Sequence, residues 1–317
     1  MANIVINNYC NLQCPYCFAD SINGVPENMS LNEFKDILTF INHAESINIL
    51  GGEPTLHPQL QSILNILYEY GVESQEVTWL FTNGINLRGF LPWFSKHNDF
   101  MRILINCNTP VIQTEEQWSN LLETIDIIYT DETLIPIVIL GCNLYSDCAD
   151  YSYLWNLVDQ YNLNTIRVSV SSPGSKLKTW RNKKWEYFNL MKPIFMQFIT
   201  DATERSVNLM FDCSQLPKCM FTHEELTFIE SRGWLQTIEY CVPPVDILMN
   251  GKAIPCLGNY VPIDYTNFGS YAELRHYFTL VTNQNAANNN GQGACANCIK
   301  REYLTCQGGC LAFAHLE

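Results

Sequence analysis

Basic residues are scarce in this chain of 317 residues, where 18 lysines and arginines face 32 acidic residues and the formal net charge is −14. A nucleic-acid-binding surface needs a basic patch, so this balance argues against a nucleic-acid partner. The sequence also lacks an apolar run of 18 residues and a recognisable signal peptide. These absences predict a cytoplasmic protein with no membrane partner.

Cysteine, in contrast, is abundant, with 14 residues spread over the whole chain. Disulfides are rare in proteins that stay in a reducing compartment, so this number predicts metal ligation. No internal repeat is visible. A chain of this length has room for a barrel of about 200 residues and a smaller appended domain.

Three cysteines stand close together near the beginning of the chain, in the spacing CxxxCxxC formed by Cys10, Cys14 and Cys17. They follow the β-branched run 4–7, which is typical of a buried strand. Three thiolates from one loop suit an iron–sulfur cube that keeps one iron without a protein ligand. The alternative is half of a zinc site, which normally takes four ligands.

A second motif follows the apolar run 47–50, where Gly51, Gly52, Glu53 and Pro54 end a predicted strand. Glycines allow the backbone to approach a ligand closely, and a proline ends a strand. An edge of this composition suits the binding of a cationic amine. By itself the motif predicts only a turn at the end of a strand.

CxxxCxxC with an aromatic residue, Tyr16, before its third cysteine, followed by GGEP, resembles the radical S-adenosylmethionine (SAM) enzymes. The resemblance implies that a [4Fe-4S] cluster at the three cysteines chelates SAM and that its electron cleaves SAM to a 5′-deoxyadenosyl radical. It also implies that Gly51, Gly52 and Glu53 bind the SAM amino group and that Tyr16 contacts the cofactor. A reductant such as flavodoxin or ferredoxin would supply the electron.

Strand-like and helix-like segments alternate along residues 1–212, which predicts an α/β fold with a parallel sheet. With the resemblance, we expect a partial (β/α)6 radical SAM barrel over this range. The expected strands are 4–7, 47–50, 76–81, 101–106, 135–140, 165–170 and 207–211. The expected helices are 31–44, 59–70, 115–128, 151–161 and 183–205, the last kinked or divided at Pro193. The segment 282–293, rich in Asn, Gln and Gly, is expected to be a loop.

Polar residues follow several of these strands. Thr82-Asn83-Gly84 closes the third strand and resembles a turn common in radical SAM enzymes, with Gly84 left-handed. The resemblance assigns Asn106 and Asn108, after the fourth strand, to the SAM ribose. Arg167, Ser169 and Ser171 alternate and therefore share one face of their strand. If that face points into the barrel it meets the SAM carboxylate or ribose, and if it points outward it is solvated.

The last third of the chain, residues 213–317, changes character because cysteines recur while helical periodicity weakens. These cysteines are Cys213, Cys219, Cys241, Cys256, Cys295, Cys298, Cys306 and Cys310. So many thiols with so little regular core predict a small domain folded around metal. Asn250-Gly251 is a strong hairpin signal between Cys241 and Cys256. Cys107, Cys142 and Cys148 are expected to be buried core residues instead.

The pattern C-x9-G-x4-C, followed by CxxC and CxGGC, resembles the SPASM or shorter twitch extension of radical SAM enzymes, which holds auxiliary iron–sulfur clusters. The resemblance implies two ligand sets. Cys241, Cys256 and Cys310 would bind the barrel-proximal cluster, with Cys213 or Cys219 as the fourth ligand, and Cys295, Cys298 and Cys306 would bind a second cluster.

Two departures from the SPASM pattern concern that second set. Seven residues instead of the usual five separate Cys298 from Cys306, and no later cysteine supplies a final ligand. The sequence therefore does not identify the fourth ligand. One auxiliary cluster together with a four-cysteine zinc site is the alternative.

Enzymes of this architecture very often modify ribosomally made peptides, by epimerisation, thioether formation or carbon–carbon crosslinking. We therefore expect a peptide substrate, recognised at the barrel mouth, by the extension or through another protein. Cys213 or Cys219, assisted by Asp212, is a candidate to give a hydrogen atom to a substrate radical. A radical SAM dehydrogenase of a small molecule or protein side chain, and a non-catalytic zinc- or cluster-binding scaffold, are the alternatives.

Overall fold

The computed structural model describes residues 1–17, 19, 25–43, 45–146, 150–171, 183–211, 216–234, 244–256, 261–289, 295, 297–299, 306 and 308–310. The strands are β1 (Ala2–Val5), β2 (Ile47–Leu50), β3 (Thr78–Thr82), β4 (Met101–Asn106), β5 (Val138–Leu144), β6 (Thr165–Val170), β7 (Asn208–Phe211), β8 (Val245–Ile247), β9 (Lys252–Ile254) and β10 (Ile263–Asp264). They form one sheet in the order β10-β9-β8-β1-β2-β3-β4-β5-β6-β7.

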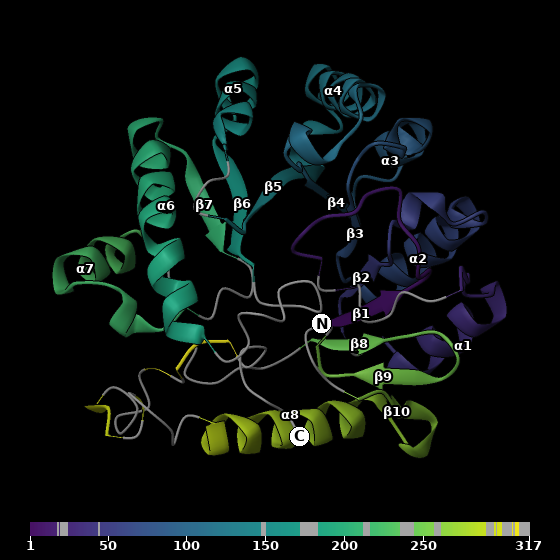
Figure 1. The fold of residues 1–317 in the computed structure, drawn as a ribbon. Coiled ribbons are helices and arrows are strands. Elements are labelled where there is room, and N and C mark those ends of the chain that lie inside the picture. The colour runs from purple at the N-terminus through teal and green to yellow at the C-terminus, as the bar shows by residue number, and fades with distance from the viewer. Residues whose placement is uncertain are drawn as a thin grey trace.

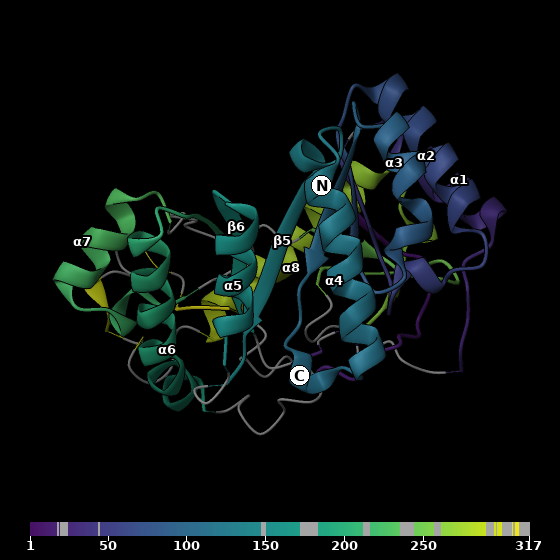
Figure 2. The ribbon, with the colours of Figure 1, turned by 90° about the horizontal axis from the view of Figure 1, so that it is seen from above.

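Strands β1 to β7 are all parallel to their neighbours, and helices connect them along the chain. The helices are α1 (Leu31–Ile41), α2 (Leu60–Ser74), α3 (Leu91–Lys96), α4 (Glu115–Thr130), α5 (Ser152–Tyr161), α6 (Lys184–Glu204), α7 (His223–Ser231) and α8 (Tyr271–Asn289). The sheet curves, and α1 to α6 cover its outer side (Figures 1 and 2). The α/β class and the partial barrel expected from the sequence are confirmed.

The two faces of the curved sheet differ in polarity. Ile4, Ile49 and Ile103 are completely buried and belong to the main hydrophobic core that the outer helices share. Because side chains alternate along a strand, their neighbours point to the inner face. There Asn3 Nδ2 donates to Asp246 Oδ1 (2.5 Å), joining β1 to β8 through buried polar groups.

Helix ends carry signals that are visible in the sequence. The Ser30 side chain accepts a hydrogen bond from Glu33 N (3.1 Å) and starts α1. Thr114 and Gln117 form a reciprocal capping box at the start of α4. Such caps satisfy backbone N–H groups that have no partner within the helix.

Five helices lie close to the positions expected from local patterns, whereas α3, α7 and α8 were not expected. Helix α6 continues through Pro193 without being divided. The expected loop at 282–293 was wrong for residues 282–289, which belong to α8. Leu274, Phe278, Thr282 and Ala286 are buried at four-residue intervals, so one side of α8 packs against the protein although its composition is polar.

The hairpin expected at Asn250-Gly251 is present between β8 and β9. Because Ile247 pairs with Ala253 and Leu248 N donates to Lys252 O (2.8 Å), residues 249–251 form the turn. Asn250 and Gly251 have positive φ angles there, 61° and 70°. Strand β8 also pairs in parallel with β1. Part of the segment 213–317 therefore continues the barrel sheet, and the division of the chain at residue 212 stays a prediction.

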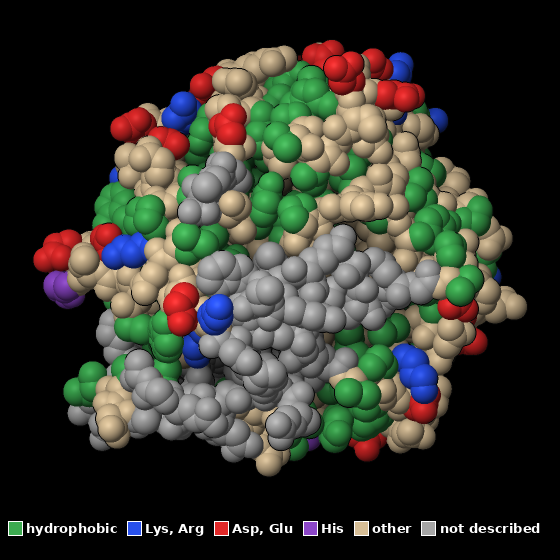
Figure 3. Space-filling view, in the orientation of Figure 1, with side chains coloured by type: hydrophobic (Ala, Val, Ile, Leu, Met, Phe, Trp, Pro, Cys, Tyr) green, Lys and Arg blue, Asp and Glu red, His purple; other side chains and the backbone are tan. Residues whose placement is uncertain are grey.

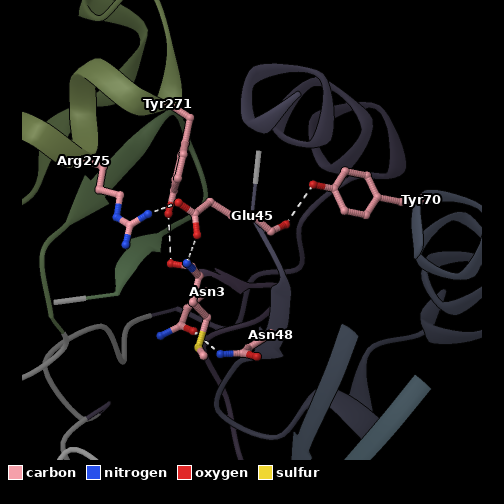
Figure 4. A network of polar contacts seen from close by, with 7 residues as sticks. Asn3, Glu45, Asn48, Tyr70, Tyr271 and Arg275 are labelled. Carbon is pink, nitrogen blue, oxygen red and sulfur yellow. Dashed lines mark hydrogen bonds and ion pairs between the residues drawn. The ribbon is translucent and has the colours of Figure 1, made fainter. Parts of the chain in front are cut away.

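Polar contacts attach α8 to the beginning of the barrel (Figure 4). The Tyr271 hydroxyl donates to the Met1 carbonyl (3.0 Å), and Arg275 pairs with the Glu45 carboxylate. Tyr70 of α2 donates to the Glu45 carbonyl (3.0 Å). The contacts connect three segments that are distant in sequence.

On the face shown in Figure 3, acidic side chains lie mainly toward the outer edge, over the helices. Within the part of the chain that the structure describes, no helix has both the length and the apolar character needed to cross a membrane.

We expect Tyr271→Ala to lower the free energy of unfolding by about 3–5 kcal/mol, because a nearly fully buried aromatic ring is lost. Tyr271→Phe removes only the hydroxyl and should cost about 0.5–1.5 kcal/mol. Leu280→Ala is the control, since Leu280 is 55% exposed on the same helix. Anaerobic urea unfolding monitored by tryptophan fluorescence measures all three. Equal effects of Tyr271→Ala and Leu280→Ala would show that α8 is not held at this end.

Candidate active site

The loop that carries Cys10, Cys14 and Cys17 begins just beyond the carboxyl end of β1, where parallel α/β folds place their chemistry. Its backbone turns between the second and third cysteines, with Cys17 N donating to Cys14 O (3.1 Å). The Cys10 sulfur accepts from Leu12 N (3.3 Å) and lies 3.9 Å from Asn83 Nδ2. Burial of the sulfur raises the pKa of Cys10 to about 11, so this thiol is protonated until a metal binds.

The glycines of the GGEP segment pack directly against the residues that lead into this loop. Gly52 N donates to Asn7 O (2.9 Å) and Glu53 N donates to Tyr9 O (2.8 Å). A Cβ atom on Gly51 would lie 1.9 Å from Asn7 Oδ1, and one on Gly52 would lie 2.1 Å from Tyr9 O. Only glycine fits at both positions, and this contact fixes the start of the cysteine loop.

The carboxylate of Glu53 is engaged inside the protein. It accepts from Thr55 N (3.0 Å), Thr55 Oγ1 (2.6 Å), Thr82 Oγ1 (2.6 Å) and Asn83 N (2.8 Å), and the residue is 2% exposed. Burial raises the pKa of Glu53, and these hydrogen bonds oppose the rise. Glu53 thus connects the ends of β2 and β3, where Gly84 has the expected left-handed conformation (φ 80°).

Tyr16 is buried and lies against residues that follow β4 and β5. Its hydroxyl donates to Asn108 Oδ1, and its ring centroid lies 4.8 Å from that of Tyr145. Asn108 Nδ2 in turn donates to the Asn106 carbonyl (3.2 Å). Among the described residues, the buried Oδ1 atom of Asn106 has no hydrogen-bond partner. An unpaired buried acceptor is a position where a ligand donor would be stabilised.

Arg167 and Ser169 share one face of β6, as alternation predicts, and that face is the inner one. Ile166 and Val168 belong to the helix-side core. Arg167 Nη1 and Ser169 Oγ both donate to Asn143 Oδ1 of β5, at 3.1 Å and 2.7 Å.

Asn143 was not singled out from the sequence. Asn143 lies opposite Ser169 in the sheet, and Gly141 lies opposite Arg167. Because Asn143 and Gly141 are two positions apart on β5, alternation places both on the inner face, and this was the sequence signal for Asn143. Ser171, also predicted on this face, is buried.

Several residues considered for catalysis or metal binding fall on chain that is not described. Asp212, Cys213 and Cys241 lie outside the described residues, and so does Cys148, which was expected in the core. Cys107 and Cys142 are buried in the main core, as expected.

The other cysteines of the extension are described. Cys219 is exposed, Cys295 is buried, and the rest are partly buried: Cys256, Cys298, Cys306 and Cys310. None of the described cysteines takes part in a disulfide.

The donor set of the first loop fits an iron–sulfur cube. Among the described residues, no three His, Cys, Asp or Glu side chains lie close enough to hold a single metal ion. A zinc ion would hold its thiolates at about 2.3 Å, around one centre. A cube binds each cysteine through a different iron, so its ligands stand further apart. Gly51 and Gly52 pack directly against Asn7 and Tyr9, and this close backbone contact holds the start of the loop that carries the three cysteines.

Residues 4–131 match the family model described as the Radical SAM superfamily. This segment is a radical SAM domain. It contains the cysteine loop, the GGEP segment and the ends of β3 and β4, which are the elements whose geometry is described above.

Two curated proteins resemble part of this chain. Molybdenum cofactor biosynthesis protein 1 of Mus musculus is 35% identical over 96 residues, which is 28% of this chain and 14% of that protein. The S-adenosylmethionine-dependent nucleotide dehydratase of Selenomonas ruminantium is 33% identical over 79 residues, 24% of this chain and 28% of that protein. The chain thus matches less than a third of the length of either relative.

Solved structures share the fold over almost the whole chain. Streptococcus suis SuiB bound to the precursor peptide SuiA has a TM-score of 0.64 at 15% identity, covering 98% of this chain and 71% of SuiB. The anSMEcpe structure with bound AdoMet and the Cp18Cys peptide has a TM-score of 0.65 at 15% identity, covering 98% of this chain and 88% of that chain. These likenesses show that the chain shares its fold with those structures beyond residue 131 as well.

We expect Gly52→Ala to abolish most of the iron bound at the cysteine loop, because the added methyl group collides with the Tyr9 backbone. Gly89→Ala is the matched control, since a Cβ there meets no atom within 4 Å. The measurement is iron and sulfide per chain after anaerobic reconstitution, in a background that lacks Cys256 and Cys298. Full iron loading of Gly52→Ala would show that the contact does not position the loop.

Proposed function

We propose that the protein is a radical SAM enzyme that abstracts hydrogen from a ribosomally synthesised peptide. The observation that carries the proposal is the contact between the cysteine loop and the GGEP glycines, above a curved sheet with a polar inner face. When bound, the [4Fe-4S] cluster and SAM supply a 5′-deoxyadenosyl radical on one-electron reduction. The chain itself has to hold these groups, orient SAM and position the peptide.

The described residues divide this work. Cys10, Cys14 and Cys17 would hold the cluster and would leave one iron without a protein ligand, available to SAM. Because the Glu53 carboxylate is occupied by Thr55, Thr82 and Asn83, we assign recognition of the SAM amino group to the backbone at Gly51 and Gly52. Glu53 contributes by keeping the ends of β2 and β3 together.

On the opposite side of the barrel mouth, Arg167 and Ser169, oriented by Asn143, are assigned to the SAM carboxylate. Arg167 is the cation that a carboxylate requires, and the Asn143 oxygen fixes the direction of its guanidinium group. Asn106 and Asn108 are assigned to the ribose, whose hydroxyl groups would donate to the unpaired Asn106 oxygen. Tyr16, fixed by Asn108, closes the site beside the third cysteine.

A peptide substrate is supported by the two similar structures, which contain a precursor peptide and the Cp18Cys peptide. A flavodoxin- or ferredoxin-type reductant is the proposed electron donor. Epimerisation, thioether formation and carbon–carbon crosslinking are the proposed outcomes, and Cys213 or Cys219, assisted by Asp212, is the candidate for hydrogen donation in an epimerase.

A small-molecule substrate is the second candidate. It is favoured by one of the curated relatives, which is an S-adenosylmethionine-dependent nucleotide dehydratase. In that case 5′-deoxyadenosine would form at the same rate with and without a peptide.

We expect Arg167→Ala to weaken SAM binding by roughly 10- to 100-fold, since a hydrogen bond to a charged group contributes about 1.5–3 kcal/mol. Arg88→Ala is the control because Arg88 forms an exposed ion pair with Glu123 away from the site. Equilibrium dialysis of SAM against the reconstituted protein gives both dissociation constants. An unchanged constant for Arg167→Ala would remove Arg167 from the SAM site.

The peptide proposal predicts that a small peptide encoded beside this protein changes mass when the two are co-expressed. Crosslinking or thioether formation removes two hydrogen atoms, whereas epimerisation in deuterated water replaces one hydrogen atom of the peptide with deuterium. The control is the Cys10, Cys14 and Cys17 triple alanine variant, which should neither modify the peptide nor release 5′-deoxyadenosine. Release by the wild type without any peptide change would favour the small-molecule alternative.

A further inference from the structure

The cysteine loop is held not only at its start but also at Asn11, which stands between the first and second cysteines. The side-chain oxygen of Asn11 accepts a hydrogen bond from Asn83 Nδ2 (2.7 Å). Its backbone carbonyl accepts another from Gln117 Nε2 (3.0 Å). Two side chains, one just after β3 and one in the first turn of α4, therefore reach the same residue from positions 72 and 106 residues away along the chain.

The local turn after β3 decides which end of the Asn83 amide faces the loop. Asn83 Oδ1 accepts from Ile85 N (3.1 Å), which is the hydrogen bond of an Asx turn. Because the oxygen is engaged in its own turn, the amide directs its NH2 group toward Asn11. Asn83 is 7% exposed, and its backbone N donates to the Glu53 carboxylate (2.8 Å), so two further contacts fix the position of the residue.

The Gln117 amide is oriented in the same way by the capping box of α4. Its Oε1 accepts from Thr114 N (2.9 Å), while Thr114 Oγ1 accepts from Gln117 N (3.2 Å). The Nε2 group therefore faces Asn11. In Asn83 and in Gln117 alike, a short-range hydrogen bond occupies the side-chain oxygen, and the NH2 group makes the long-range contact that only this orientation of the amide allows.

The neighbours of Asn11 extend this hold to the sulfur of the first cysteine. Leu12 is buried in the main hydrophobic core, and its backbone N donates to Cys10 Sγ (3.3 Å). Asn83 Nδ2, which carries a second hydrogen besides the one that Asn11 accepts, lies 3.9 Å from the same sulfur. A thiol at this place directs its proton toward Asn11 Oδ1, 3.7 Å away. A thiolate has no proton and only accepts, so both N–H groups then face a negative charge.

We propose that Asn83 and Gln117 are positioning residues that hold the cysteine loop at Asn11, and that Asn83 also donates a hydrogen bond to the Cys10 sulfur when this sulfur binds iron. The inference rests on the proposed function only in taking the loop to hold a [4Fe-4S] cluster. It gives a task to the turn after β3 and to the start of α4. Both residues act through the loop and not on SAM.

The two anchors have one effect in common and one that belongs to Asn83 alone. A hydrogen bond to a ligating sulfur changes how easily an iron–sulfur cluster accepts an electron. Reduction adds negative charge, which an N–H donor stabilises, so the contact from Asn83 should raise the reduction potential. Gln117 contacts a backbone carbonyl, so its loss should loosen the loop and leave the potential unchanged.

The hold on the loop is tested in the full chain without metal, by hydrogen–deuterium exchange of the peptide that covers residues 9–17. Asn83→Ser is the informative variant, because a serine hydroxyl still accepts from Ile85 N in a turn of the same kind but is too short to reach Asn11. It should exchange roughly 2- to 10-fold faster than the wild type in this peptide, as should Gln117→Ala, since each loses one neutral hydrogen bond.

Two control variants leave these contacts in place. Gln13→Ala changes an exposed amide of the same loop, and Thr114→Ala weakens the cap of α4 but keeps the backbone N that donates to Gln117. Both should exchange like the wild type in the loop peptide. Asn11→Ala removes the acceptor of Asn83, so adding Asn83→Ser to it should change little further. Wild-type exchange in Asn83→Ser and Gln117→Ala would show that the loop is not held at Asn11.

The contact with the sulfur is tested by the reduction potential of the cluster, followed by electron paramagnetic resonance in an anaerobic redox titration. All variants are compared in the background that lacks Cys256 and Cys298. Asn83→Ser should shift the potential to a more negative value, whereas Gln117→Ala and Gln13→Ala should leave it unchanged. The same potential in Asn83→Ser as in the parent would show that Asn83 does not donate to the sulfur. An equal shift in Gln117→Ala would show that movement of the loop, and not the hydrogen bond, sets the potential.

The two measurements separate this inference from the proposed function. A parent protein that assembles no [4Fe-4S] cluster at the first loop would sink the proposed function, and the exchange of the metal-free protein would still decide whether Asn83 and Gln117 hold the loop. SAM cleavage by the wild type, together with unchanged exchange and potential in the variants, would keep the proposed function and overturn the inference.

Discussion

The contact between the GGEP glycines and the segment 7–9 is the constraint on which the candidate site depends. Two backbone hydrogen bonds join the residues after β2 to the segment that follows β1. A Cβ atom on Gly51 or Gly52 would collide with Asn7 or Tyr9 of that segment. The cysteine loop starts from this fixed point. From here the Glu53 carboxylate carries the constraint to β3 through Thr82 and Asn83. The ends of three parallel strands are thus held in one arrangement around the place where the cluster would bind.

A second constraint is the polarity of the inner face of the sheet. Buried polar groups destabilise a protein unless they are hydrogen-bonded, and here they bond to each other across strands. Asn3 forms such a hydrogen bond with Asp246, from β1 to β8. Asn143, near the carboxyl end of β5, accepts hydrogen bonds from Arg167 and Ser169 of β6. The Asn143 oxygen fixes the direction of the Arg167 guanidinium group on this inner face.

The last third of the chain is attached to the barrel at several places. Strand β8 pairs with β1, and α8 contacts Met1 and Glu45. Farther along, Lys184 holds the tail at Gly308. These contacts involve residues more than 100 positions apart, so they form only when the barrel is folded. In such a chain the auxiliary cysteines receive their positions from the barrel as much as from their own sequence.

The sequence by itself determined the features that rest on neighbouring residues. The CxxxCxxC loop, the GGEP turn, the strands at 47–50, 101–106 and 165–170, and the hairpin at Asn250-Gly251 follow from local spacing, propensity and turn chemistry. Only the tertiary structure decided which distant groups meet: that Glu53 faces Thr82 and Asn83, that Asn143 joins Arg167 to Ser169, and that the polar segment 282–289 is helical because one side packs against the protein. Local patterns limit the backbone of a segment, but long-range pairing depends on how the whole chain buries its apolar surface and satisfies its polar groups.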